Sequence, residues 1–321
     1  MKIIAKIYAD SIHMEAMEKL LKRLPAEHRL YVKILNEIGA TKGGDFGEEI
    51  VYKDLEKMQL PFKYYVFHKL LLHAENTFEL DFLLITPFGA VILEVKNIIG
   101  ELEFQENPSQ LIQRKETGEI KKYPCPALQL NEYKYQLSQF FMDHNILVPI
   151  FGAVVFASRN SFVKTSTDKA IILNRNEVRP YLRQFQKHKP TLTMEEMEKM
   201  KDILLMKNTP FAKFPLTKHY SIQPEELIRG VECSKCGFIG MLKLKRTWHC
   251  PACKTNDPYA YKNALTTYFL LYKDSITNKE CREFLLLNNR YEAKHILSNS
   301  DLIKHGNNKC TIYKMKKPFI N

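Results

Sequence analysis

An acidic residue stands inside one apolar stretch of the sequence, and a second acid precedes a lysine in the next stretch. Asp81 lies in ELDFLLIT, where a charged side chain is costly unless it has a partner. Thirteen residues later comes Glu94-Val95-Lys96, and strand alternation places Glu94 and Lys96 on one face. Two acids and a lysine on neighbouring strands can therefore converge.

Carboxylates on adjacent strands offer the oxygen ligands that Mg²⁺ or Mn²⁺ prefers. A lysine beside them can orient or deprotonate an attacking water, while the metal stabilises charge on a phosphate. Glu48, in preference to Glu49, is the further acid expected in the metal shell. Gln129 and Tyr133, one helical turn apart, are supporting polar groups. The set predicts a hydrolytic phosphodiesterase, although an ion pair between Asp81 and Lys96 would use the same residues structurally.

The elements that carry these residues begin with helices. Apolar periodicity predicts two helices over residues 11–39, broken at Pro25, and a third helix from the glycine-rich stretch to Pro61. Three β-rich stretches follow and predict a meander; they cover residues 63–72, 78–86 and 90–95.

The remaining elements complete an αβββαβ order. A polar, proline-containing loop is expected over residues 100–126, followed by a helix over LQLNEYKYQLSQFF. A buried strand is predicted over residues 151–158, with an edge strand over 170–173. The expected fold class is α/β.

The element order and four motifs resemble a known family. The motifs are Gly44-x-x-Gly47-Glu48, the strand around Asp81, the run from Phe88 to Asn97, and Pro126-x-x-Gln129. They are similar to the NERD (nuclease-related) domain of the PD-(D/E)xK restriction-endonuclease-like superfamily, over roughly residues 41 to 185. Leu80 departs from the superfamily, in which a proline often precedes the acid. The resemblance implies a metal-dependent DNA-processing role, with matching positions at Glu48, Asp81, Glu94, Lys96 and Gln129.

Four cysteines form two pairs further along the chain. Cys233-Ser-Lys-Cys236 and Cys250-Pro-Ala-Cys253 have the spacing of a tetrahedral Cys₄ site. Four thiolates leave no open position, so we expect a structural Zn²⁺ in a segment that resembles a zinc ribbon. His249 is a neighbour rather than a ligand in this interpretation.

A basic segment lies between the cysteine pairs. Lys243, Lys245 and Arg246 accompany Trp248 without an acid, which predicts phosphate contact with one stacking ring. The alternative is a solvated face on which Trp248 covers the metal site.

The C-terminal segment is predicted to be three helices and a hairpin, over residues 264–272, 279–287, 290–298 and 302–315. It resembles a winged helix, with a recognition helix bearing Asn289, Arg290 and Lys294. The wing would be basic, with lysines 304, 309, 314, 316 and 317. A protein-interaction helical bundle is the alternative.

Charge and composition limit the partners and the compartment. The formal charge of +12 favours nucleic acid, although a basic surface alone would also give it. No segment has the apolar length that spans a bilayer, and the start lacks a secretory apolar region, so no membrane contact and a cytoplasmic location are expected. Seven cysteines, an odd number, fit metal binding better than disulfides.

The sequence predicts five parts: N-terminal helices over residues 1–40, a nuclease-like domain over 41–188, a helical connector over 189–230, a zinc ribbon over 231–254 and a winged-helix-like domain over 255–321. Together they predict a metal-dependent DNA nuclease or DNA-end-processing phosphodiesterase. A non-catalytic DNA-binding or regulatory protein on a nuclease scaffold is the first alternative, and an RNA-processing factor is the second. Sequence leaves the oligomeric state open.

Overall fold

The computed structural model describes residues 2–6, 12–209, 214–307 and 311–316, without the side chains of 2–6. The chain forms two compact units. Unit 1 combines Met1–Ala9 with Ala40–Pro210, and unit 2 combines Asp10–Gly39 with Phe211–Asn321. These units cut across the five expected parts, because the N-terminal helices group with the C-terminal third of the chain. In the described part of the chain, no helix is both long and apolar enough to cross a membrane.

Unit 1 is built on a mixed six-stranded sheet with the order β1-β2-β3-β4-β8-β10. The antiparallel meander β2-β3-β4 is present as predicted, whereas β1, β8 and β10 pair in parallel with their neighbours. The edge strand β1 was not predicted. The strands are β1 (Lys2–Lys6), β2 (Tyr64–His73), β3 (Thr77–Thr86), β4 (Gly89–Lys96), β8 (Ile150–Phe156) and β10 (Ile171–Asn174).

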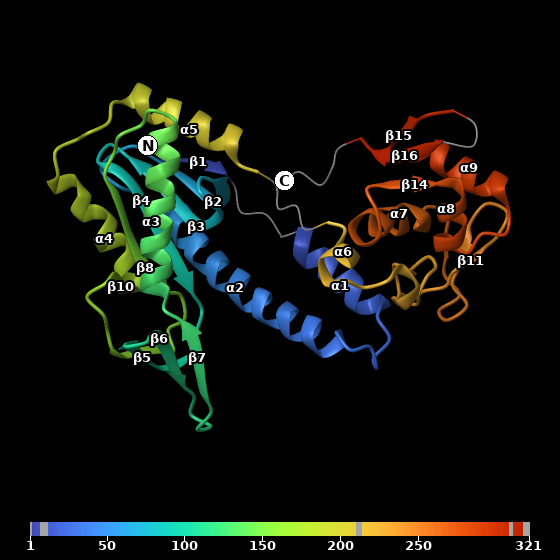
Figure 1. Cartoon of the computed structure of the whole chain (residues 1–321), viewed down its shortest axis with the longest axis horizontal. Coiled ribbons are helices and arrows are strands. Elements are labelled where there is room, and N and C mark those ends of the chain that lie inside the picture. The colour runs from blue at the N-terminus through green and yellow to red at the C-terminus, as the bar shows by residue number, and fades with distance from the viewer. Residues whose placement is uncertain (1, 7–11, 210–213, 308–310, 317–321) are drawn as a thin grey trace. The chain divides into compact units, whose positions relative to one another are not determined.

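Helices cover both faces of this sheet, as α/β architecture requires. One buried cluster joins the sheet to α3 (Pro126–Asp143) and α5 (Met194–Lys207). A second cluster joins the other face to α2 (Tyr31–Lys57) and α4 (Val178–Gln184). Figure 1 shows α3 lying along β4 and β8. Short 3₁₀ turns, η1 (Arg175–Glu177) and η2 (Phe185–Lys187), flank α4.

α2 is a single helix, so the predicted break at the glycine-rich stretch was wrong. Each glycine costs a helix about 1 kcal/mol relative to alanine, and burial of Val51 and Leu55 against the sheet offsets this cost. Gly47 has a packing role, since a Cβ there would lie 2.6 Å from Asn97 Cβ.

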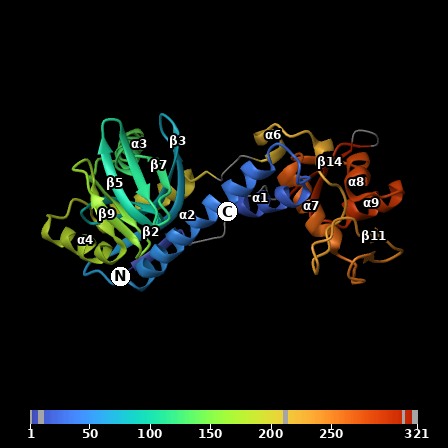
Figure 2. The ribbon, with the colours of Figure 1, turned by 90° about the horizontal axis from the view of Figure 1, so that it is seen from below.

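Residues 100–126, predicted to be a loop, form most of a second sheet. Its order is β7-β6-β5-β9, and Figure 2 shows β5 beside β9. Leu102, Phe104 and Leu111 are buried in the core on the α3 side, while the charged residues between them alternate outward. Because so many residues of this stretch are charged or polar, the two-residue alternation was not recognised and a loop was predicted. The strands are β5 (Gly100–Glu106), β6 (Ser109–Arg114), β7 (Ile120–Pro124) and β9 (Ser161–Thr165).

Unit 2 has one continuous core, to which α1, α7, α8 and the cysteine segment all contribute. A three-stranded sheet with the order β14-β16-β15 adjoins the helices. Lys309, Cys310, Lys317 and part of the predicted hairpin lie outside the described residues. The elements are α1 (Ile12–Arg23), α6 (Leu216–Tyr220), η3 (Pro224–Glu226), β11 (Leu242–Lys243), β12 (Trp248–His249), β13 (Asn256–Asp257), α7 (Ala260–Leu271), β14 (Ser275–Thr277), α8 (Asn278–Leu285), α9 (Arg290–Ser298), β15 (Leu302–His305) and β16 (Ile312–Met315).

Candidate functional site

Asp81 and Glu94 meet where strands β3 and β4 stop pairing. The antiparallel ladder ends at Phe82 opposite Leu93. Beyond this point Asp81 Oδ2 accepts a hydrogen bond of 2.7 Å from the backbone amide of Val95. The two acids therefore lie at one end of the strand pair.

Lys96 is held beside Glu94 by a short chain of hydrogen bonds. Its Nζ donates to Glu94 Oε1 at 2.6 Å and to Gln129 Oε1 at 3.0 Å. The amide of Gln129 in turn donates to the Tyr133 hydroxyl at 2.9 Å. The structure thus brings together four residues that the sequence analysis singled out: Glu94, Lys96, Gln129 and Tyr133. Lys96 pairs with Glu94 and Gln129, and not with Asp81 as the structural alternative expected.

One of the two carboxylate oxygens of Glu94 makes no hydrogen bond to the described residues. Only 1% of the residue is exposed, and its Oε2 is buried without a hydrogen-bond partner among the described residues. A buried anionic oxygen left unpaired is costly unless a cation occupies the neighbouring space. The donor chemistry fits a hard divalent cation, which prefers carboxylate oxygens.

Burial and crowded negative charge raise the pKa values of both acids. Desolvation, together with the charges of Glu94 and Glu48, holds the pKa of Asp81 well above its ordinary value. Burial also raises the pKa of Glu94, against the opposing effect of Lys96. Burial alone would lower the pKa of Lys96, but the charges of Glu94 and Asp81 outweigh it and raise the value. A cation at this site would relieve the repulsion between the acids.

Glu48 is already paired with residues of β2. Its Oε2 lies 2.7 Å from His68 Nε2 and 3.6 Å from Lys69 Nζ. Across the described ranges, three carboxylate oxygens from Glu48, Asp81 and Glu94 do not come within 4.8 Å of one another. The structure therefore places Glu48 near the two acids without completing the predicted three-acid cluster.

His68 and Lys69 were missed in the sequence. His68 is 1% exposed within the apolar strand YYVFHKLLLH, and its ring packs beside the rings of Tyr52 and Phe82. A polar residue inside an apolar strand is the signal that identified Asp81, and it could have identified His68 in the same way.

The helix position of Glu48 follows from a close approach between α2 and the end of β4. Gly47 leaves room for Asn97, whose Nδ2 donates to the carbonyl of Gly43 at 2.8 Å. The amide and the glycine together fix the adjacent Glu48 against the sheet.

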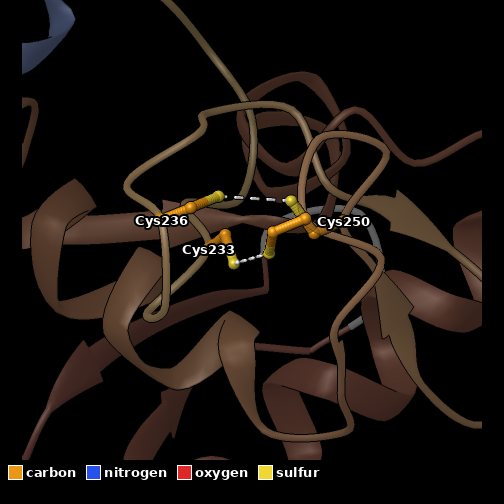
Figure 3. Close-up of side chains that lie close together, drawn as sticks. Cys233, Cys236 and Cys250 are labelled. Carbon is orange, nitrogen blue, oxygen red and sulfur yellow. Dashed lines mark hydrogen bonds between the residues drawn. The ribbon is translucent and has the colours of Figure 1, made fainter.

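The four cysteines of unit 2 converge as their spacing predicted. All four sulfur atoms lie within 4.8 Å of one another, with Cys233 Sγ 3.6 Å from Cys253 Sγ and Cys236 Sγ 3.5 Å from Cys250 Sγ (Figure 3). Hydrogen bonding with Thr255 lowers the pKa of Cys253 to about 6, whereas the pKa of Cys236 in the same cluster is raised to about 12. The cluster can hold a metal such as zinc.

Trp248 is not available for stacking on a base, contrary to the first interpretation. The ring is 1% exposed and belongs to the unit 2 core, with Lys243 Nζ 5.8 Å from its centre. A large apolar ring is favourable in a core, and Trp248 packs in the same buried cluster as Cys233 and Cys250. Lys245 and Arg246 are exposed.

The residues proposed for the recognition helix lie at the start of α9. The Asn289 side chain caps the helix by accepting a hydrogen bond of 2.8 Å from the Tyr291 amide. The Arg290 guanidinium lies 4.8 Å from the centre of the Tyr291 ring, and Lys294 is exposed. Arg290 and Lys294 are therefore accessible, whereas Asn289 is engaged in capping.

Comparison with known proteins identifies one region of the chain. The family model described as a nuclease-related domain (NERD) matches residues 43–157, a span that includes Glu48, Asp81, Glu94, Lys96 and Gln129. No curated protein and no solved structure matches the chain. The match points to a nuclease-related function and to interaction with nucleic acid. Residues 43–157 of this chain are a nuclease-related domain.

Proposed function

We propose that this protein is a metal-dependent DNA nuclease or DNA-end-processing phosphodiesterase. The observation that carries the proposal is the Oε2 atom of Glu94, which is buried and has no hydrogen-bond partner among the described residues. It lies near the Asp81 carboxylate and the Lys96 ammonium. Asp81 and Glu94 would hold Mg²⁺ or Mn²⁺, with Glu48 as a further ligand. The bound ion would supply neutralisation of charge on the scissile phosphate.

We assign Lys96 the role of a hydrogen-bond donor to the attacking water or to the phosphate. The ordinary pKa of a lysine lies well above neutral pH, so its amine is protonated there and donates hydrogen bonds. Gln129 Oε1 and Glu94 Oε1 hold it in place, so a third N–H can orient the water or stabilise developing negative charge. Orientation is therefore a better role for Lys96 than deprotonation of the water.

Unit 2 would deliver nucleic acid to this site. We infer a structural Zn²⁺ at the four cysteines and a winged helix in the order α7, β14, α8, α9, β15, β16. Lys294 on α9 and the strand residues Lys304 and Lys314 would contact DNA phosphates, although Lys314 also pairs with Asp274 at 3.1 Å. Location in the cytoplasm is part of the same proposal.

A non-catalytic nucleic-acid-binding protein is the second candidate. It is favoured by one observation, the pairing of Glu48 with His68 and Lys69, which leaves Asp81 and Glu94 as the available acids. This candidate predicts binding that weakens with salt and is insensitive to divalent cations.

Cleavage assays separate these candidates. Linear, circular and single-stranded DNA, and RNA of the same sequence, are incubated with Mg²⁺ or Mn²⁺ and the protein, its Glu94→Ala variant or its Lys96→Ala variant. Cleavage of DNA that both substitutions abolish supports the nuclease. Cleavage of RNA alone would support the RNA-processing alternative, and retained binding without any cleavage would favour the non-catalytic protein.

A further inference from the structure

Three arginines follow one another along the surface of unit 1 at four-residue intervals. Arg175 belongs to η1, and Arg179 and Arg183 belong to α4. All three line a cavity of about 340 Å³ between α2 and α4, which also includes Asp54 and Asn176. Arg179 and Arg183, four residues apart in α4, are about 6 Å apart along the helix axis.

The row carries unneutralised positive charge. Arg175 is fixed by Asp54, to which its Nη2 donates at 2.9 Å alongside a second bond from its Nε. Arg179 and Arg183 are exposed, and no acid within the described ranges forms an ion pair with either of them. Three guanidinium groups and one carboxylate give the cavity wall a net positive charge.

The apolar face of α4 holds the arginines in place. Val178, Tyr181 and Leu182 are buried in the same cluster as Val51 and Leu55 of α2. This burial leaves the positions of Arg179 and Arg183 on the solvent side of the helix. The row therefore lies on a rigid support.

The row begins at the sheet edge that carries the candidate site, but on the opposite face: Glu94 and Lys96 face α3, whereas the row lies on the side of α2 and α4. A strand that follows the row would therefore have to turn around this edge to reach Lys96. Strand register aligns Lys96 with Phe156 and Phe156 with Asn174, so these residues form one line across β4, β8 and β10. Neighbouring strands are about 4.8 Å apart, which places Asn174 roughly 10 Å from Lys96 along this line. Arg175 comes directly after Asn174.

We propose that Arg175, Arg179 and Arg183 form a track for the backbone phosphates of a nucleic-acid strand that reaches the candidate site. The inference rests on the proposed action on nucleic acid. A guanidinium matches a phosphate with two parallel hydrogen bonds, and the cavity admits the phosphate between α2 and α4. Contacts of this kind position a strand without reading its sequence.

Salt dependence of binding tests the track. Fluorescence anisotropy with labelled single-stranded and duplex DNA, without added divalent cation, gives Kd across a salt series for the protein and for Arg179→Gln/Arg183→Gln. Loss of two phosphate contacts should lower the slope of log Kd against log salt by about 1.4 for single strands or 1.8 for duplex. We expect Kd to rise about tenfold, in line with two contacts of roughly 0.7 kcal/mol each.

Two controls test whether the effect belongs to these two positions and whether it depends on their charge. Lys199→Gln/Lys207→Gln removes the same charge from exposed positions of α5, which packs on the other face of the sheet, and should leave the slope unchanged. Arg179→Lys/Arg183→Lys keeps the charge and should restore the slope. Both substituted arginines are exposed, so the thermal unfolding midpoint should not change.

The outcomes distinguish this inference from the proposed function. If the protein binds and cleaves DNA but the arginine and lysine double variants behave alike, the track is wrong and the nuclease proposal stands. If a mononucleotide displaces DNA as effectively as a competing strand, the cavity is a nucleotide pocket and the track is likewise wrong. If the unaltered protein binds no nucleic acid, both fail.

Discussion

The Lys96 ammonium lies 2.6 Å from Glu94 Oε1, two residues back on the same strand. This pairing occupies one oxygen of Glu94 and leaves the other, among the described residues, without a hydrogen-bond partner. The two oxygens of one carboxylate can therefore serve different purposes: one positions the lysine and the other is available to a cation.

Removal of the Lys96 ammonium should abolish cleavage and spare binding. For Lys96→Ala we expect the cleavage rate to fall about 10²- to 10⁴-fold, as for loss of a positioned charge or proton-transfer group. Cleavage rates and anisotropy on the same DNA measure both effects. Lys122→Ala, on the exposed surface of β7, is the matched control. Equal losses in the two variants would argue against a role for Lys96.

Gln129 should matter more than the tyrosine behind it. Gln129→Leu removes an acceptor from Lys96, and the cleavage rate should fall about tenfold because a hydrogen bond to a charged group contributes roughly 1.5 kcal/mol. Tyr133→Phe removes only the bond to Gln129 and should have a smaller effect. Single-turnover rates at saturating DNA isolate the step. A larger effect for Tyr133→Phe would contradict this order.

Asp81 should make the metal-free protein less stable as pH rises. Its pKa is raised on folding, so its contribution to the free energy of unfolding is fully present below the ordinary value of 3.8 and is lost as pH rises through the folded-state value. Asp81→Asn keeps an acceptor for the Val95 amide and should flatten this decline. Urea unfolding across a pH series measures it, with the exposed Asp143→Asn as control. Identical profiles would contradict the expected shift.

Metal loss should be visible in the fluorescence of Trp248, the one tryptophan of the chain. Metal at the four cysteines would stabilise unit 2, so Cys236→Ser or a chelator should remove zinc and shift the emission to the red as the buried ring meets water. Elemental analysis should find one zinc per chain. Cys125→Ala, in unit 1, should leave both readings unchanged. Unchanged emission after zinc loss would show that the metal does not hold this core together.

The parts of the fold that sequence could predict have strong local signals. Stretches rich in β-forming apolar residues identified β2, β3 and β4, and paired cysteines identified the metal cluster. Asp81 and the Glu94-x-Lys96 pair were detectable because charges in buried strands need partners.

The remaining features depend on long-range packing. Glycine-rich composition suggested an interruption in α2, but contact between Gly47 and Asn97 makes the glycine favourable inside a helix. Trp248 adjoins the basic segment in the sequence, which suggested a stacking role, but its ring packs in the core of unit 2. The partner of Glu48 lies on β2, and nothing near Glu48 in the sequence indicates His68.

The interleaved connectivity of the two units has a consequence during synthesis on the ribosome. Residues 10–39 belong to unit 2, yet roughly 170 residues of unit 1 are translated before the rest of unit 2 begins. At about 5–20 residues per second this interval lasts roughly ten to thirty seconds. Met17, Leu20 and Leu24 of the nascent chain lack their partners on α7 and the cysteine segment throughout that time. A chaperone that binds short apolar helices would find its substrate in α1.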